Sequence, residues 1–313
     1  MSGFRLFACA VVAAAGAAVA ASAAPTQPTL RFTAPVTGLA LERGSLWVSI
    51  AGNDVVLRLD ARTGRQLARI DLPRADRRAF GGGTLAAAPD KIWIAAPVHV
   101  VDDPSVGDAS GWIGRLAPRT LRLELVQVHG DRPEQVAVGR TGVWISGLHT
   151  LRRVDLRTGT IMASRRFNRY LGVVAVTRNA VWVAGSNTGR LWQVDPRTLK
   201  IRTSIIVGPS AAGSSLAVAR GRVWAATDRG LVAVDATTAK IVSRVRLPGA
   251  GQVAFDGTRL WALADGGVYS VAGTRVTRRL RLPSKVFGLL VATGHDVWLS
   301  DEAANSLRRV PAG

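Results

Sequence analysis

Three of the four histidines lie in polar stretches that also hold acidic residues. The residues concerned are His99, Asp102, Asp103, His129, Asp131 and His149. Neutral imidazole nitrogens and carboxylate oxygens together suit divalent cations. The sequence contains no H-x-H or H-E-x-x-H pair, however, so no two of these residues have the spacing of a known metal motif. Two interpretations are therefore open: a divalent metal site, or solvated loop residues and no cofactor.

Other polar residues in comparable stretches are candidates for ligand binding. They are Arg132, Glu134, Arg169, Tyr170 and Arg229. Because guanidinium groups bind carboxylates and phosphates through paired N–H donors, we expect an anionic partner. This partner is a small ligand, an envelope polymer or a protein. Nucleic acid is not expected, because the arginines are spread along the chain and form no single patch.

The sequence contains no recognisable catalytic constellation. There is no G-x-S-x-G motif, and Cys9 is the single cysteine. Gly81-Gly82-Gly83 is not followed by the lysine of a phosphate-binding loop. We therefore expect a non-catalytic binding module, and the alternative is a metal-assisted lyase or lactonase-like enzyme that uses the histidines above.

The N-terminus has the features of a signal peptide. Arg5 precedes an apolar stretch at residues 6–20, and Ala21-Ser22-Ala23-Ala24-Pro25 supplies the small residues of a cleavage site. We expect residues 1–24 to be removed and the protein to be secreted or periplasmic; an uncleaved anchor is the alternative. Removal takes away one of the 41 basic residues and none of the 21 acidic ones, so the formal charge falls from +20 to +19. No transmembrane span is expected in the mature chain.

A repeated tryptophan shows which elements must position these side chains. Seven tryptophans, each within a short apolar run, are separated by 46, 51, 38, 42, 37 and 37 residues. They are Trp47, Trp93, Trp144, Trp182, Trp224, Trp261 and Trp298. This period is typical of propeller blades with four strands, because each unit consists of β-branched runs split by turn residues. We expect the tryptophans to lie in the core, on strands that are buried on both faces.

The first unit illustrates the pattern. Strands are expected at residues 36–40, 46–50, 55–60 and 66–72, and the first of these is rich in small residues, as suits a strand near a crowded propeller axis. The turn at residues 60–64 reads Asp-Ala-Arg-Thr-Gly, and related turns begin at Asp155, Asp195 and Asp235. An aspartate accepts hydrogen bonds from the backbone of the turn that it opens, so we expect these carboxylates to form turns rather than to catalyse.

The two ends of the chain predict how the ring closes. After Trp298 only one more strand, residues 306–310, precedes the C-terminus, so the last blade lacks a strand. An unassigned strand at residues 29–33 precedes the first unit and would supply it. We therefore expect an all-β, seven-bladed β-propeller with four-stranded blades, in which the N-terminal strand closes the seventh blade. Residues 25–313 would form one domain, and we expect a monomer.

This unit resembles that of bacterial extracytoplasmic seven-bladed propellers of the YVTN-repeat type and of the virginiamycin B lyase (streptogramin lyase) family. The shared elements are the apolar aromatic strand and the strand that ends in Asp-x-x-Thr-Gly, and they recur over the whole chain after residue 24. The resemblance to the lyases implies histidines where inner strands begin, with an acidic partner and magnesium. The inner strands here begin without histidine, at Val36-Thr37-Gly38, Pro133-Glu134-Gln135, Tyr170-Leu171-Gly172, Gly251-Gln252-Val253 and Val286-Phe287-Gly288. In addition, no tryptophan is followed by aspartate, as it is in WD40 repeats.

Propeller topology predicts where the candidate residues lie. Loops that enter an inner strand and loops that follow a second strand share one face, around the mouth of the central channel, and we expect the ligand site there. Residues 97–111 form the one large insertion, in the second blade. Many of the other arginines fall on the outer two strands and their turns, where we expect them to protect exposed edges. They include Arg62, Arg65, Arg69, Arg152, Arg153, Arg157, Arg197, Arg202, Arg275, Arg278, Arg279, Arg281, Arg308 and Arg309.

Overall fold

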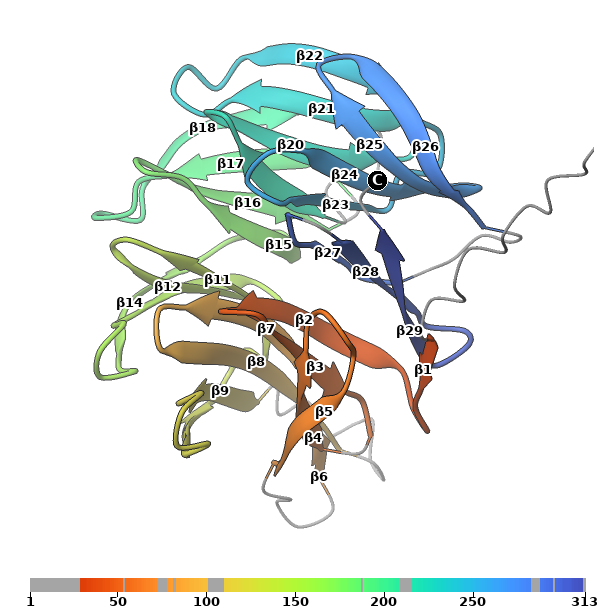
Figure 1. Cartoon of the computed structure of the whole chain (residues 1–313). Helices are drawn as coiled ribbons and strands as arrows, with labels where there is room; N and C mark the ends of the chain where they lie inside the picture. The colour runs from red at the N-terminus through yellow and green to blue at the C-terminus, as the bar shows by residue number, and fades with distance from the viewer. Residues whose placement is uncertain are drawn as a thin grey trace, which may run out of the picture.

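The computed structural model describes residues 29–52, 54–72, 78–80, 83–100, 110–186, 188–208, 215–282, 288–294 and 296–311, with the backbone alone at 78–80 and 98–100. These residues form seven antiparallel sheets (Figure 1). The inner strands contact one another in sequence order, and the last also contacts the first, so the sheets form a closed ring. The predicted all-β, seven-bladed propeller is confirmed. The expected signal peptide lies outside the described residues, which contain no helix long and apolar enough to cross a membrane.

The blades are numbered in chain order, and each is given from its inner to its outer strand. Blade 1 has β2 (Val36–Glu42), β3 (Ser45–Ile50), β4 (Val55–Asp60) and β5 (Gln66–Asp71). Blade 2 has β7 (Thr84–Ala88), β8 (Lys91–Val100), β9 (Gly111–Leu116) and β10 (Leu123–Val128), with the additional strand β6 (Arg78–Phe80). Blade 3 has β11 (Pro133–Gly139), β12 (Gly142–Gly147), β13 (Thr150–Val154) and β14 (Ile161–Arg166). Blade 4 has β15 (Leu171–Val176), β16 (Val181–Gly185), β17 (Arg190–Val194) and β18 (Ile201–Ile206). Blade 5 has β19 (Leu216–Ala219), β20 (Arg222–Thr227), β21 (Gly230–Asp235) and β22 (Ile241–Arg246). Blade 6 has β23 (Gln252–Phe255), β24 (Leu260–Ala264), β25 (Gly267–Ala272) and β26 (Arg275–Arg281). Blade 7 has β27 (Leu290–Ala292), β28 (Asp296–Asp301), β29 (Ser306–Pro311) and β1 (Thr29–Arg31).

The repeated tryptophans form the core, as predicted. Six of the seven are completely buried, and Trp224 is 6% exposed. Their strands are largely apolar and almost entirely buried, because a neighbouring blade covers each face. Inner strands are more crowded still: a Cβ atom on Gly38 of β2 would lie 2.2 Å from the carbonyl oxygen of Gly83, at the entrance to blade 2. This close approach explains why small residues are frequent in the inner strands.

The N-terminal strand closes the ring, as predicted. Strand β1 pairs antiparallel with β29 in the register Thr29↔Arg308, Leu30↔Leu307 and Arg31↔Ser306 (Figure 1). Leu30 packs against the hydrophobic cluster that contains Trp298. Trp298 in turn donates its Nε1–H to the carbonyl oxygen of Ala61 in blade 1, at 2.9 Å. Blade 7 is thus joined to blade 1 by strand pairing, apolar packing and a buried hydrogen bond.

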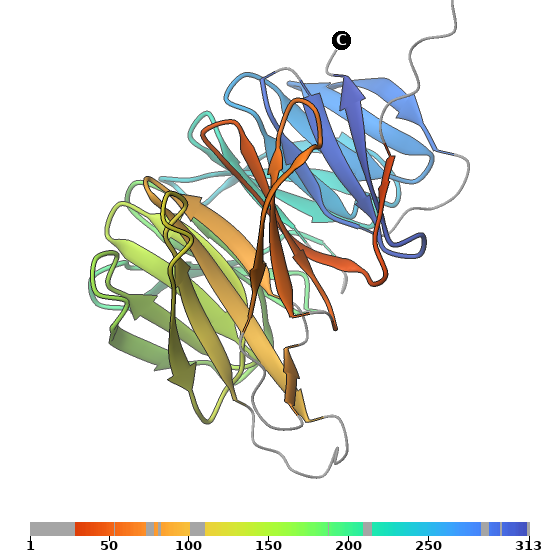
Figure 2. The same cartoon turned by 60° about the horizontal axis from the view of Figure 1, so that its bottom comes forward.

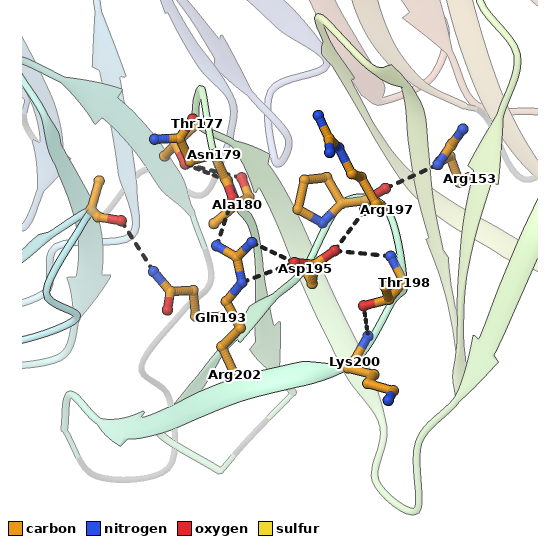
Figure 3. A network of polar contacts seen from close by, with 12 residues as sticks. Arg153, Thr177, Asn179, Ala180, Gln193, Asp195, Arg197, Thr198, Lys200 and Arg202 are labelled. Atoms are coloured by element: carbon orange, nitrogen blue, oxygen red, sulfur yellow. Dashed lines mark hydrogen bonds and ion pairs between the residues drawn. The ribbon is translucent and has the colours of Figure 1, made fainter.

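The aspartate turns form as the sequence predicts. In blade 4, Asp195 Oδ1 accepts hydrogen bonds from the backbone N–H groups of Arg197 (2.8 Å) and Thr198 (2.9 Å), and Arg202 binds Oδ2 (Figure 3). The hydrogen bond from Thr198 and the side-chain bond from Arg202 hold the pKa of Asp195 well below its ordinary value. The residue that closes the turn adopts a positive φ, which is 75° at Gly64 but also 58° at Ala239. In blade 5, therefore, an alanine occupies a conformation that favours glycine.

A second repeated position joins neighbouring blades. The third-strand residue paired with the tryptophan is an arginine in four blades and Gln193 in blade 4. These side chains donate to carbonyl oxygens in the outer turn of the next blade. The bonds are Arg58 to Pro118 (3.0 Å), Arg115 to Arg157, Arg153 to Pro196 (3.1 Å), Gln193 to Ala236 (3.1 Å) and Arg309 to Arg62. Arg153 and Arg309, for which edge protection was expected, therefore also bind across the seams between blades.

The insertion in blade 2 begins later than predicted. Residues 97–100, expected in a loop, continue strand β8, because β6 in the preceding connection pairs with them in the register Arg78↔Val100, Ala79↔His99 and Phe80↔Val98. Figure 2 shows this pair of strands projecting from the blade. Residues 101–109 of the insertion, including Asp102 and Asp103, lie outside the described residues, as does the side chain of His99.

Candidate functional site

The loops named by the sequence do share one face. In an antiparallel blade, the loop after the second strand and the loop that enters the next blade lie at the same end of the sheet, and we call this end the loop face. In blades 3 and 4 the two kinds of loop are bonded through their backbones. Phe167 N donates to His149 O (2.7 Å), and Ser186 N donates to Tyr170 O (2.9 Å). These loops are therefore held by the same kind of hydrogen bond as the strands.

Asp131 has a structural role at the loop face. Its side chain is buried, and its two carboxylate oxygens accept hydrogen bonds from the backbone N–H groups of Leu148 (2.7 Å) and His149 (3.1 Å). The guanidinium of Arg152, also buried, lies 4.0 Å away. Burial lowers the pKa of Arg152, and the charge of Asp131 acts in the opposite direction. Asp131 thus anchors the loop that carries His149, and it is turned away from solvent.

His149 and Tyr170 meet on the exposed side of these loops. Their ring centroids are 4.6 Å apart, with the planes tilted by 37°. The Tyr170 side chain is 59% exposed, the largest value among the exposed large apolar and aromatic side chains of the described residues. Arg169, its neighbour in the chain, is also exposed. The sequence placed both His149 and Tyr170 among the ligand-binding candidates but did not predict that they would be in contact.

The remaining candidates of blade 3 form no joint site with this pair. Arg132 Nε donates to Glu134 Oε1 at 2.9 Å, so these two side chains neutralise each other. His129 is exposed. Within the described part of the chain, no three His, Cys, Asp or Glu side chains lie close enough to hold a metal ion. A metal site that uses His99, Asp102 or Asp103 stays a prediction, because those side chains are not described.

The central channel is lined by neutral side chains. Its cavity is about 250 Å³, and each of the seven inner strands or the residues beside it contributes to the wall. The polar side chains among the lining residues are Thr37, Thr84, Gln135, Ser215 and Gln252. Of the residues predicted for the ligand site, those whose side chains the structure describes are not part of this lining. The described lining of the channel therefore offers hydrogen bonds but no charge.

Two larger grooves open between blades at the outer strands. Groove 4/5, between blades 4 and 5, is about 770 Å³ and contains Arg229, which was predicted for the ligand site, together with Arg244 and Arg246. Groove 7/1, between β1 and blade 1, is about 550 Å³ and is lined by Arg31, Arg65 and Arg69 among others. Arg244 and Arg246 are not among the residues predicted from the sequence for the ligand site. The available signal was their spacing: Arg244 and Arg246 are two residues apart on an outer strand, and residues two apart on a strand share one side.

The sequence matches no protein-family model and no curated protein. Among solved structures, the chain resembles the WD40 domain of Pan2 from Neurospora crassa, with a TM-score of 0.70, 11% identity and 90% of each chain covered. It resembles a chain of the mitotic checkpoint complex, with a TM-score of 0.74, 10% identity and 99% of each chain covered. It also resembles BamB from Moraxella catarrhalis, with a TM-score of 0.57, 16% identity, and 88% of this chain and 82% of that chain covered. These likenesses concern the propeller fold alone.

Proposed function

We propose that this propeller is an extracytoplasmic, non-catalytic interaction module of the YVTN-repeat type, and that it binds a partner protein through the loop face of blades 3 and 4. The observation that carries the proposal is the exposed Tyr170, stacked on His149 above a loop that Asp131 anchors from below. Propeller folds host many unrelated functions, so the proposal rests on this site and not on the fold.

Physical chemistry favours a binding role for such an arrangement. Tyrosine and arginine are enriched at protein interfaces, where a large ring contributes contact area and a guanidinium contributes directed hydrogen bonds. The backbone at Tyr170 is already bonded to blade 4, and its ring already rests on His149. A preorganised aromatic side chain loses less conformational entropy on binding than one on a free loop, so more of the contact energy contributes to affinity.

The described lining of the channel carries no charge, and this favours a binding site on the surface of the loop face over one inside the channel. The cavity of about 250 Å³ has no charged side chain among its described lining residues, and this lining would leave the anionic groups of a partner uncompensated. Exposed Arg169 beside Tyr170 would instead pair with a carboxylate of the partner outside the channel. We therefore propose that the acidic or polar rim of the partner meets Arg169, and that an apolar or aromatic side chain meets Tyr170.

Site-specific photo-crosslinking in cells tests this proposal. A photoreactive amino acid placed at Tyr170 is expected to give a discrete protein adduct. The matched control is the same amino acid at Thr237, which is exposed in the outer turn at the opposite end of blade 5. No adduct at position 170, equal adducts at both positions, or a polydisperse smear that indicates a polymer would each overturn the proposal of a protein partner.

The proposed export from the cytoplasm has a separate test. A fusion of residues 1–30 to alkaline phosphatase, which is active only outside the cytoplasm, is expected to be active. The N-terminus of the exported full-length protein is expected to be Pro25. An inactive fusion would overturn the proposed export, and a retained first residue would show an uncleaved anchor instead.

A further inference from the structure

We propose that groove 4/5 binds a small organic anion that carries an apolar group, with its carboxylate or phosphate held between Arg244 and Arg246. The groove lies at the outer rim, between strand β18 of blade 4 and strands β21 and β22 of blade 5. Tyr170 and His149 are not part of its lining, so this site is distinct from the surface proposed above to bind a protein.

Strand alternation directs both arginines into the groove. Val245, between them in β22, is buried in the cluster shared with blade 6. The side chains of Arg244 and Arg246 consequently lie on the opposite side of the strand, towards blade 4. Arg244 confirms this direction, because its Nη1 donates to the carbonyl oxygen of Val207 at 3.0 Å. That bond occupies one of the five N–H donors of the guanidinium, and it orients the group.

Groove 7/1 occupies the equivalent seam and shows what is different about groove 4/5. In blade 1, Arg69 pairs in register with Leu57, as Arg244 pairs with Val232 in blade 5. The next position on the same side is Asp71 in blade 1 but Arg246 in blade 5, paired with Val55 and Gly230 respectively. Asp71 accepts a hydrogen bond from Arg69 Nε at 2.9 Å and lies 2.8 Å from its Nη2.

Asp71, which neutralises Arg69 in blade 1, is therefore replaced in blade 5 by Arg246, which adds a second positive charge beside Arg244. Within the described part of the chain, no carboxylate lies within ion-pair distance of Arg244 or Arg246. Arg229 lines the same groove, and Asp228 beside it offsets one charge. Three arginines and one aspartate leave this lining with a net charge of +2.

The shape and the apolar lining define the rest of the ligand. A volume of about 770 Å³ falls in the range of small-molecule sites. The groove includes buried Val207 and Val232 and the side chain of Ile206, which is 51% exposed. A guanidinium pair recognises a carboxylate or phosphate, and apolar walls favour a hydrocarbon or aromatic group next to it. A ligand with both parts would cover Ile206 and neutralise the arginines at the same time.

Binding of the fluorescent dye anilinonaphthalene sulfonate to the full chain tests this proposal, because the dye joins an anionic group to aromatic rings. The Arg246→Asp variant reproduces the charge pattern of blade 1, and we expect it to weaken dye binding about tenfold or more. The matched control is Arg65→Asp in groove 7/1, which makes the same change in charge and should alter binding less than about twofold.

Competition identifies the anionic group. Octanoate and octyl phosphate are expected to displace the dye, whereas the neutral octanol is not; the better of the two anions shows whether carboxylate or phosphate is preferred. Unchanged dye binding in Arg246→Asp would overturn the proposal. Equal losses in both variants would overturn it as well, since the attraction would then follow net charge alone. Unfolding curves of each variant show whether a loss reflects the groove or the fold, and Arg246→Ser provides a second, smaller change at the same position.

Discussion

The hydrogen bond between Trp298 and Ala61 gives the clearest energetic prediction, because the chain contains a matched tryptophan without it. Trp93 occupies the same position in blade 2 and is also completely buried. A glycine of the next blade lies beside each ring: Gly64 beside Trp298 and Gly159 beside Trp93. Among the described atoms, however, Trp93 Nε1 has no hydrogen-bond partner. Trp298→Phe and Trp93→Phe therefore remove the same atoms from similar surroundings and differ mainly in one bond.

The difference between the two variants follows from the hydrogen bond. Loss of buried indole surface and the cavity that remains contribute to both, so these effects cancel in the comparison. Trp298→Phe also leaves the Ala61 carbonyl without this donor, which costs about 1–3 kcal/mol. Trp93→Phe instead removes a buried N–H that has no partner, which relieves a penalty of about 1 kcal/mol. We expect Trp298→Phe to be the more destabilising by about 2 kcal/mol or more.

Urea unfolding monitored by circular dichroism measures this difference, with the midpoint and slope fitted for both variants. In thermal scans the same difference corresponds to about 4 °C in Tm for a domain of this size. Equal destabilisation by the two substitutions would refute the reasoning, because it would mean that the bond across the closing seam contributes no net stability. A changed slope of unfolding free energy against urea concentration in one variant alone would also count against the reasoning. The unfolded states of the two variants would then differ, and their stabilities could not be compared directly.

Three further predictions concern the turns and the closure. Ala239→Gly is expected to stabilise the fold by up to about 1 kcal/mol, and Gly159→Ala to destabilise it by a similar amount, because both positions require a positive φ; thermal denaturation of the two variants checks this. Leu30→Ala in the closing strand is expected to cost about 1–2 kcal/mol in urea unfolding, whereas the exposed Leu67→Ala should stay within about 0.5 kcal/mol, and equal effects would contradict closure by β1. The pKa of Asp195 is lower in the folded state than in the unfolded chain, so its stabilisation is present above about pH 4 and is lost as the pH falls below that value. Asp195→Asn should therefore lower Tm at neutral pH and make Tm less dependent on pH in the acid range, and an unchanged acid profile would contradict this assignment.

Most of the fold was predictable from the sequence, because the pattern that defines it is local. The tryptophan strands and the aspartate turns each depend on residues close together in the chain and repeated with one period. The N-terminal closing strand pairs across the whole length of the chain, and it was predictable because counting the repeats leaves the last blade one strand short. A strand buried on both faces must be apolar, and a turn that needs a carboxylate acceptor has one at the same position in each repeat. The extension of β8 was missed because it depends on pairing with β6, whose residues 78–80 give no strong strand signal of their own.

The candidate site was predicted less well, because it depends on how loops from different repeats pack. The sequence assigned Asp131 to ligand binding, yet the structure buries it beneath the backbone of Leu148 and His149. Arg132 and Glu134 were also assigned to ligand binding, and in the structure they pair with each other. Whether a carboxylate faces solvent or a backbone N–H is decided by the neighbouring loop, and a sequence does not state which loops will be neighbours.

The sequence by itself determined the architecture of this protein: an all-β ring of seven blades, with tryptophans in the core and a first strand that completes the last blade. Only the tertiary structure decided which polar residues act together. It joined His149 to Tyr170 across two blades, directed Arg153 and Arg309 into the seams, and opened a groove at Arg244 and Arg246 where blade 1 has a neutral pair. The physical reason is how far apart in the chain the interacting residues lie. Periodic burial and turn formation are local properties of the chain, whereas charge pairing and grooves depend on distances between residues that the closed ring brings together.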